Sequence, residues 1–171
     1  IGTLIESDLS PALAARSGGP ALAADEEYLP FAEAGLDLVI SNLSLHWVND
    51  LPGALVQIRQ SLKPDGLFLA AILGGETLHE LRHALIEAEM AESGGISPRL
   101  SPFAELSNAA GLLQRAGFAL PVADTDTITV TYGDAFALMH QHGRGSSFVQ
   151  PGDFCTYAAM LVKSGSKAAA D

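Results

Sequence analysis

The chain has 171 residues, of which 48% are hydrophobic and 17% charged, a composition that suits one globular domain and excludes a disordered protein. Its formal net charge of -11 argues against nucleic acid or an anionic membrane surface as a partner. The single cysteine, Cys155, excludes an intramolecular disulfide and fits a reducing compartment. The sequence contains no apolar run of the length that spans a bilayer, so we expect no membrane span.

The N-terminal part predicts a strand, a short helix and a second strand. Residues 3–6 suit a strand that ends at Asp8. Ser10 and Pro11 then have the residue types of a helix N-cap and a first helical position. Residues 21–24 make a poorer strand, because alanine is a poor strand former. The chain begins inside this pattern without a preceding glycine-rich turn, so we expect an N-terminally truncated fragment that lacks a first strand, turn and helix.

The stretch from Leu36 to Trp47 is the most informative part of the sequence. Its apolar run over residues 38–40 predicts a central strand that is buried on both faces, as in a parallel sheet. The strand should end at Ser41 and Asn42, and His46 follows at once. Ligands of open α/β sheets bind at the carboxyl ends of the strands. This stretch therefore predicts where the protein would perform chemistry.

The rest of the chain continues to alternate helices with strands, which favours a mostly parallel sheet. Thr77 and Glu80 have the spacing of a capping box at the start of one helix. Gly117 is suited to the left-handed conformation of the residue that ends another helix. In order, we expect a helix over 51–62, a strand over 67–73, helices over 77–93 and from 101 to 117, strands over 118–124 and 127–132, a short helix over 134–142, and a last strand over 154–162.

Several segments, in their order and spacing, resemble the class I S-adenosylmethionine (SAM)-dependent methyltransferases: residues 25–31, 36–39 and 45–47. The closer match is the subgroup around malonyl-acyl-carrier-protein O-methyltransferases and mitochondrial complex I assembly factors. Residues 74–78 and 94–103 resemble the assembly-factor branch in particular. The resemblance implies an α/β, Rossmann-like fold with a mostly parallel sheet and helices on both faces. It covers residues 1–139 of a single partial domain over 1–171, in which 140–171 is a divergent tail with a candidate last strand.

The resemblance also implies SAM as the cofactor and assigns residues to it. An acidic residue at a strand end hydrogen-bonds ribose hydroxyls in dinucleotide folds, and the acidic turn after the second strand would flank the adenine. Backbone carbonyls after the central strand would hold the amino group of SAM. For the acidic residues, the alternative interpretation is a solvated turn. The implied cofactor-binding residues are Asp8, Leu9, Asp25, Glu26, Asn42 and Leu43.

The remaining candidate residues concern catalysis and the acceptor. His46 could be a general base, because histidine titrates near neutral pH, or it could pack as a structural corner under the site. We expect Trp47 to be a packed wall of the substrate site. Glu76 could pair with a substrate guanidinium, and Glu27 should bond to neighbouring backbone. His79 and His83 are four residues apart, but without a Glu-x-x-His pattern we expect no metal site.

The leading hypothesis is a SAM-dependent methyltransferase with an unassigned acceptor, covered by the helix over 77–93. The alternatives are a SAM-binding arginine hydroxylase that acts as a respiratory complex I assembly factor, or a non-catalytic assembly protein of the same fold. A nicotinamide-dependent enzyme is disfavoured, because residues 25–31 and 45–47 do not have its signatures. The resemblance implies a protein or acyl-carrier substrate, and a location in a bacterial cytoplasm or the mitochondrial matrix. Without the glycine-rich turn, we expect this chain alone to bind SAM weakly or not at all.

Overall fold

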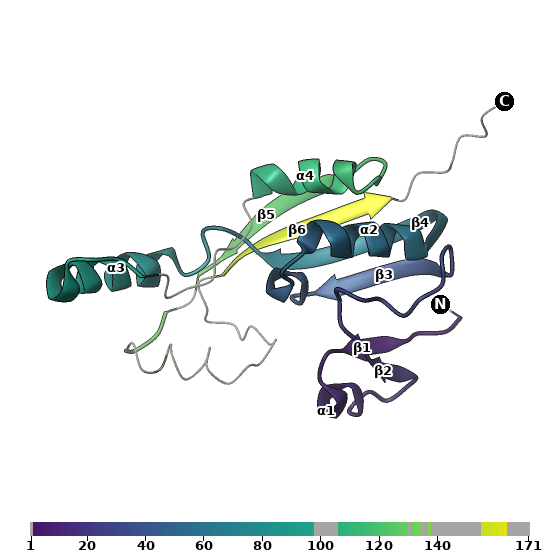
Figure 1. The fold of residues 1–171 in the computed structure, drawn as a ribbon, viewed down its shortest axis with the longest axis horizontal. Helices are drawn as coiled ribbons and strands as arrows, with labels where there is room; N and C mark the ends of the chain where they lie inside the picture. Colours follow the sequence, from purple (N-terminus) through teal and green to yellow (C-terminus); the bar gives the residue numbers. More distant parts are fainter. Residues whose placement is uncertain (1, 98–105, 130, 135–136, 138–154, 164–171) are drawn as a thin grey trace.

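Two β-sheets organise the part of the chain that the computed structural model describes, which is residues 2–97, 106–129, 131–134, 137 and 155–163 (Figure 1). The smaller sheet pairs β1 (Glu6–Asp8) with β2 (Ala21–Ala23) in parallel. The larger sheet has four strands in the order β3-β4-β6-β5. Parallel strands combined with helices confirm the predicted α/β class.

The two strands of the smaller sheet are connected by α1 (Pro11–Ala14). Ser10 is its N-cap and Pro11 its first residue, as predicted, but the Ser10 side chain makes no capping hydrogen bond. Instead the Ser10 backbone N–H donates to Asp8 Oδ1 at 2.7 Å, so the carboxylate folds over the turn that leaves β1. The strand begins at Glu6, later than expected, and the predicted β2 is confirmed.

The larger sheet contains β3 (Leu36–Asn42), β4 (Leu62–Leu73), β5 (Val122–Ile128) and β6 (Cys155–Lys163). β3 and β4 are parallel, whereas β6 is antiparallel to both of its neighbours, β4 and β5. Three of these four strands therefore run in one direction. β6 confirms the expected last strand and places it inside the sheet.

The prediction that β3 is a central strand buried on both faces is wrong for the described residues. β3 pairs with β4 alone there and forms an edge of its sheet. Val39 packs against the core, but Ile40, on the opposite face, is 60% exposed. A run of three apolar residues does not reveal how many neighbours cover it, so the sequence overestimated the burial of this strand.

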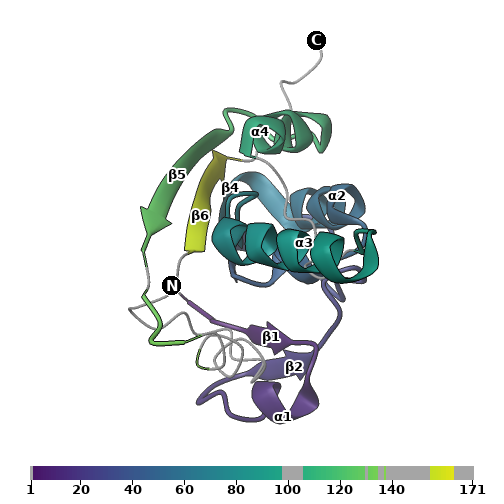
Figure 2. The same ribbon diagram turned by 90° about the vertical axis from the view of Figure 1, so that its left-hand side faces the viewer.

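The core lies between β4 and two helices, α2 (Leu51–Ser61) and α4 (Leu106–Arg115). β4 contributes Leu62, Phe68, Ala70 and Ile72 to it, and Phe68 is fully buried against Phe118. Both helices contribute to this same cluster and so share one face of the sheet (Figure 2). Helices packed on the opposite face, which the resemblance implied, are not among the described elements of this sheet.

α3 (His79–Ser93) differs from these helices, because none of its residues is buried and it projects from the rest of the molecule (Figure 1). The predicted capping box is wrong. The N-cap is Leu78, in a left-handed conformation with φ 56°, and it makes no side-chain capping bond. Thr77 is instead 1% exposed within the preceding turn. At the other end Gly94, with φ 65°, confirms the predicted stop.

The C-terminal half corrects the strand boundaries. One strand, β5, replaces the two expected over 118–124 and 127–132, and Ile128 at its end is 39% exposed. Gly117, with φ 89°, confirms the left-handed residue after α4. The expected helix start at 101–105 and most of the helix over 134–142 lie outside the described residues. In the described ranges, no helix combines the length and apolarity needed to cross a membrane.

Candidate functional site at the carboxyl ends of the strands

The predicted site residues follow the carboxyl ends of parallel strands. Asp8 ends β1, the acidic turn follows β2, and Asn42 ends β3. In Figure 1 the arrows of β1 and β3 point to the same side of the molecule. Gly74 follows β4, which is parallel to β3, so the turns after these strands share one end of the fold.

Asp8 is half-buried, and its side chain is already oriented by the protein. Its Oδ1 accepts a hydrogen bond from the Ser10 backbone N–H. Within the described part of the chain, the carboxylate accepts no other hydrogen bond. Oδ2 is thus held in a fixed direction at the strand end, where it could accept a hydrogen bond from a ligand hydroxyl. The neighbouring Leu9 is 63% exposed and presents an apolar surface beside it.

The acidic turn after β2 contains three carboxylates in different settings. Asp25 is exposed, and its Oδ1 accepts the Glu27 backbone N–H at 2.9 Å, which shapes the turn. Glu26 is half-buried. Glu27 bonds to backbone, as expected, but its partners are the N–H groups of Asn49 and Asp50, 22 and 23 residues away.

The turn after β3 carries a strained residue. Leu43 is buried and has φ 56°, a left-handed conformation that bulky residues rarely adopt. Its N–H still donates to the Ala71 carbonyl of β4 at 2.8 Å, so the sheet holds the turn in place. The Ser41 and Ser44 hydroxyls, 3.1 Å apart, close the turn around Leu43. Such strain collects at functional sites, which makes this turn a good candidate for ligand contact.

His46 and Trp47 lie in the 3-10 helix η1 (Leu45–Trp47). Desolvation on burial lowers the pKa of His46 below its ordinary value of 6.5, so the neutral imidazole is favoured at neutral pH. The prediction that Trp47 is a packed wall is wrong for the described residues, because the side chain is 75% exposed. Its indole lies 5.1 Å from the His46 ring and otherwise presents its face to solvent.

The turn after β4 places Glu76 at the surface. Its carbonyl accepts the His79 backbone N–H at 3.3 Å, and its side chain is exposed. Arg82 donates to the Gly75 carbonyl at 3.3 Å and ties the start of α3 to the turn. α3 extends on the side of the molecule to which the arrows of β1 and β3 point (Figure 1), and the expectation that it covers the acceptor site stays a prediction.

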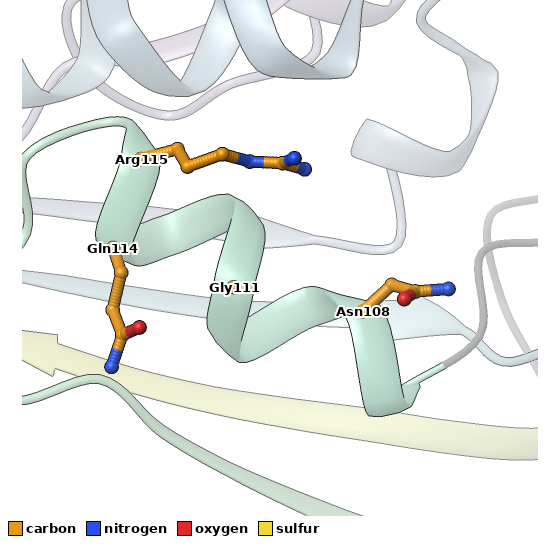
Figure 3. Close-up of a pocket in the computed structure, with 4 residues that line it drawn as sticks. All are labelled: Asn108, Gly111, Gln114 and Arg115. Carbon is orange, nitrogen blue, oxygen red and sulfur yellow. The ribbon is translucent and has the colours of Figure 1, made fainter.

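Other features of the described residues do not form a second site. The ranges that the structure describes contain no group of three or more His, Cys, Asp or Glu residues able to hold a metal ion. His79 and His83 are both exposed on α3. A shallow hollow on α4 is lined by side chains that do not converge on one point (Figure 3); they belong to Asn108, Gln114 and Arg115, around Gly111.

Comparison with known proteins shows related sequences. Residues 2–70 match the methyltransferase domain family. The human protein named arginine-hydroxylase NDUFAF5, mitochondrial, is 54% identical over 125 residues, which cover 72% of this chain and 36% of that protein. A malonyl-[acyl-carrier protein] O-methyltransferase of Xylella fastidiosa is 41% identical over 115 residues, which cover 67% of this chain and 37% of that enzyme. The chain thus spans little more than a third of the length of these relatives.

Solved structures agree with the observed fold. A SAM-dependent methyltransferase from Thermotoga maritima matches with a TM-score of 0.60 and 16% identity, over 94% of this chain and 72% of that one. At this identity the match supports the α/β arrangement of strands and helices and says nothing about the acceptor.

Proposed function

We propose that the full-length protein binds SAM and transfers its methyl group, a proposal supported by the match of residues 2–70 to the methyltransferase domain family. The observation that carries the proposal is the placement of Asp8, the turn at Asp25 and the strained turn at Leu43 after parallel strands. Each of these turns offers polar groups of the kind that one part of a nucleoside cofactor needs.

The residues present fit the nucleoside half of SAM. Asp8 has one carboxylate oxygen oriented by Ser10, which leaves the other available to a ribose hydroxyl. The turn at Asp25 and Glu26 presents carboxylates and backbone groups suited to an adenine edge. Asn42 is exposed beside Leu43, where polar groups could hold the methionine end of the cofactor.

SAM supplies a methyl group activated on a sulfonium. The task of the protein is therefore to hold an acceptor in line with that methyl group and to exclude water. Burial lowers the pKa of His46, so its neutral imidazole could act as a base that takes a proton from an acceptor. Trp47 presents an exposed indole next to it, which could bind an apolar part of the acceptor.

Calorimetric titration of SAM into the full-length protein tests the proposal. Asp8→Ala should weaken SAM binding about tenfold to a hundredfold, because a hydrogen bond to a charged group contributes about 1.5–3 kcal/mol. Asp37→Ala is the matched control. It removes an exposed aspartate in β3, near the amino end of the strand, where its partner is Lys63 at 2.8 Å. Equal SAM affinity in the wild-type and Asp8→Ala proteins would remove Asp8 from the site.

Arginine hydroxylation is the second candidate function, favoured by the 54% identity to the human arginine-hydroxylase. The exposed Glu76 carboxylate could form a bidentate contact with a substrate guanidinium. Mass spectrometry of an arginine peptide incubated with the full-length protein, SAM, dioxygen and a two-electron reductant distinguishes the reactions. Methyl transfer adds one methylene, whereas hydroxylation adds one oxygen and needs an oxidant. If arginine peptides stay unchanged while an acyl-carrier carboxylate is methylated, Glu76 has no guanidinium partner and the ester-forming reaction is favoured.

The relatives also guide the proposed partner and location. The Xylella relative is named for an acyl-carrier substrate, and the human relative for arginine and for mitochondria. We therefore propose a protein or acyl-carrier acceptor, and the mitochondrial matrix or a bacterial cytoplasm as the location. A non-catalytic assembly role would be supported if SAM bound but no acceptor were modified.

A further inference from the structure

We infer that Glu27 is a positioning residue, which holds the proposed adenine turn and the His46 turn at a fixed separation. The inference rests on the proposed function, since it concerns the two sides of the same cofactor site. These turns are far apart in the sequence and follow different strands, β2 and β3, which belong to different sheets in the described structure. Sheet hydrogen bonds between β2 and β3 therefore do not set the separation of these turns in the described structure, and side-chain contacts across it contribute.

The first contact is made by the Glu27 side chain. Its Oε1 accepts hydrogen bonds from the Asn49 backbone N–H, from Asn49 Nδ2 at 3.1 Å, and from the Asp50 backbone N–H at 3.4 Å. One carboxylate oxygen thus gathers three donors from the turn between η1 and α2. Asp50 is the N-cap of α2, so the negative charge of Glu27 also lies favourably near the positive end of the helix dipole.

The second contact binds the backbone on both sides of Tyr28. Gln57 of α2 donates from Nε2 to the Glu27 carbonyl at 2.6 Å. Its Oε1 accepts the Leu29 backbone N–H at 3.0 Å. One side-chain amide therefore provides hydrogen-bond partners for the backbone groups on both sides of Tyr28. Glu27 and Gln57 together fasten the segment to α2 and to the turn that precedes it.

These contacts link the two proposed halves of the cofactor site. Asp25 and Glu26 lie immediately before Glu27, while His46 and Trp47 lie immediately before the turn that Glu27 binds. A ligand that contacts both turns gains affinity when their separation is preorganised, because it does not have to order them on binding. A ligand that contacts the adenine turn alone gains little affinity from the contacts that hold the two turns at a fixed separation. This difference separates positioning from a general contribution to stability.

The test compares SAM with adenosine as calorimetric probes of the full-length protein. We expect Glu27→Ala to weaken SAM binding about tenfold and adenosine binding less than about threefold. Glu27→Gln should restore most of the SAM affinity, because an amide oxygen can still accept the Asn49 and Asp50 N–H groups. Glu33→Ala is the control, an exposed glutamate a few residues further along the same loop, and it should leave both affinities unchanged.

The possible results separate the inference from the proposed function. If the wild-type protein fails to bind SAM, the proposed function falls, and the positioning role falls with it. If the wild-type protein binds SAM and Glu27→Ala binds it equally well, the inference alone is overturned. Equal losses for SAM and adenosine would also overturn it, because they would indicate general damage to the fold. Faster hydrogen exchange at the Asn49 and Asp50 amides in Glu27→Ala should accompany the selective loss of SAM binding.

Discussion

Truncation of Phe68 to alanine should be among the most destabilising single changes in the described core. Phe68 is fully buried on β4, and its ring stacks on Phe118 with centroids 5.4 Å apart and planes inclined by 23°. Phe118 is itself 4% exposed, so the cavity would be enclosed on that side. Replacing a buried phenylalanine with alanine costs about 3–5 kcal/mol, from lost transfer free energy and from the cavity left behind.

That loss is large relative to the stability of a typical domain, about 5–15 kcal/mol. With a urea dependence of about 2 kcal/mol per molar, the unfolding midpoint should fall by about 2 M. Circular dichroism during urea titration of the full-length protein measures this shift. Tyr28→Ala is the control, since its ring is 78% exposed, and its effect should stay within about 0.5 kcal/mol.

A double-mutant cycle with Phe118→Ala isolates the contact between the two rings. The coupling free energy should be about 0.5–1.5 kcal/mol, the usual contribution of an aromatic pair beyond its buried area. A loss below about 1 kcal/mol for Phe68→Ala would refute the reasoning, because a fully enclosed cavity of this size cannot be so inexpensive.

Two further predictions concern His46 and two glycines, one within α4 and one just after it. Burial lowers the pKa of His46 in the folded protein below 6.5. As the pH falls, the His46 side chain is therefore protonated in the unfolded chain before it is protonated in the folded protein. The contribution of neutral, buried His46 to stability is complete above about pH 6.5 and declines as the pH falls toward the folded pKa. An NMR titration should find its midpoint below 6.5, and a midpoint above that value would contradict the burial. Gly117→Ala should destabilise the protein by about 1–2 kcal/mol, because Gly117 has φ 89°. Gly111→Ala, within α4 and with open space at its Cβ position, should stabilise the helix by up to about 1 kcal/mol in the same urea assay; equal effects of the two substitutions would contradict this reasoning.

The sequence alone determined the features that depend on local chemistry. The apolar run over 38–40 and the polar Ser41 and Asn42 predicted where β3 lies and ends, as the structure shows. Helical spacing predicted α2, and Gly117 marked the end of α4. These patterns succeed because periodicity and left-handed glycine are properties of a few consecutive residues. The identity of the proposed site came from the same local segments, through their resemblance to methyltransferases.

Long-range packing decided the rest. Whether Ile40 and Trp47 are covered depends on which elements lie over them, and that information is spread over the whole chain. The insertion of β6 between β4 and β5 joins strands far apart in sequence. The partners of Glu27 are more than twenty residues away, and no spacing rule connects them. Only the folded structure brings these groups within hydrogen-bonding distance, because a hydrogen bond depends on separation in space, whereas sequence patterns record separation along the chain.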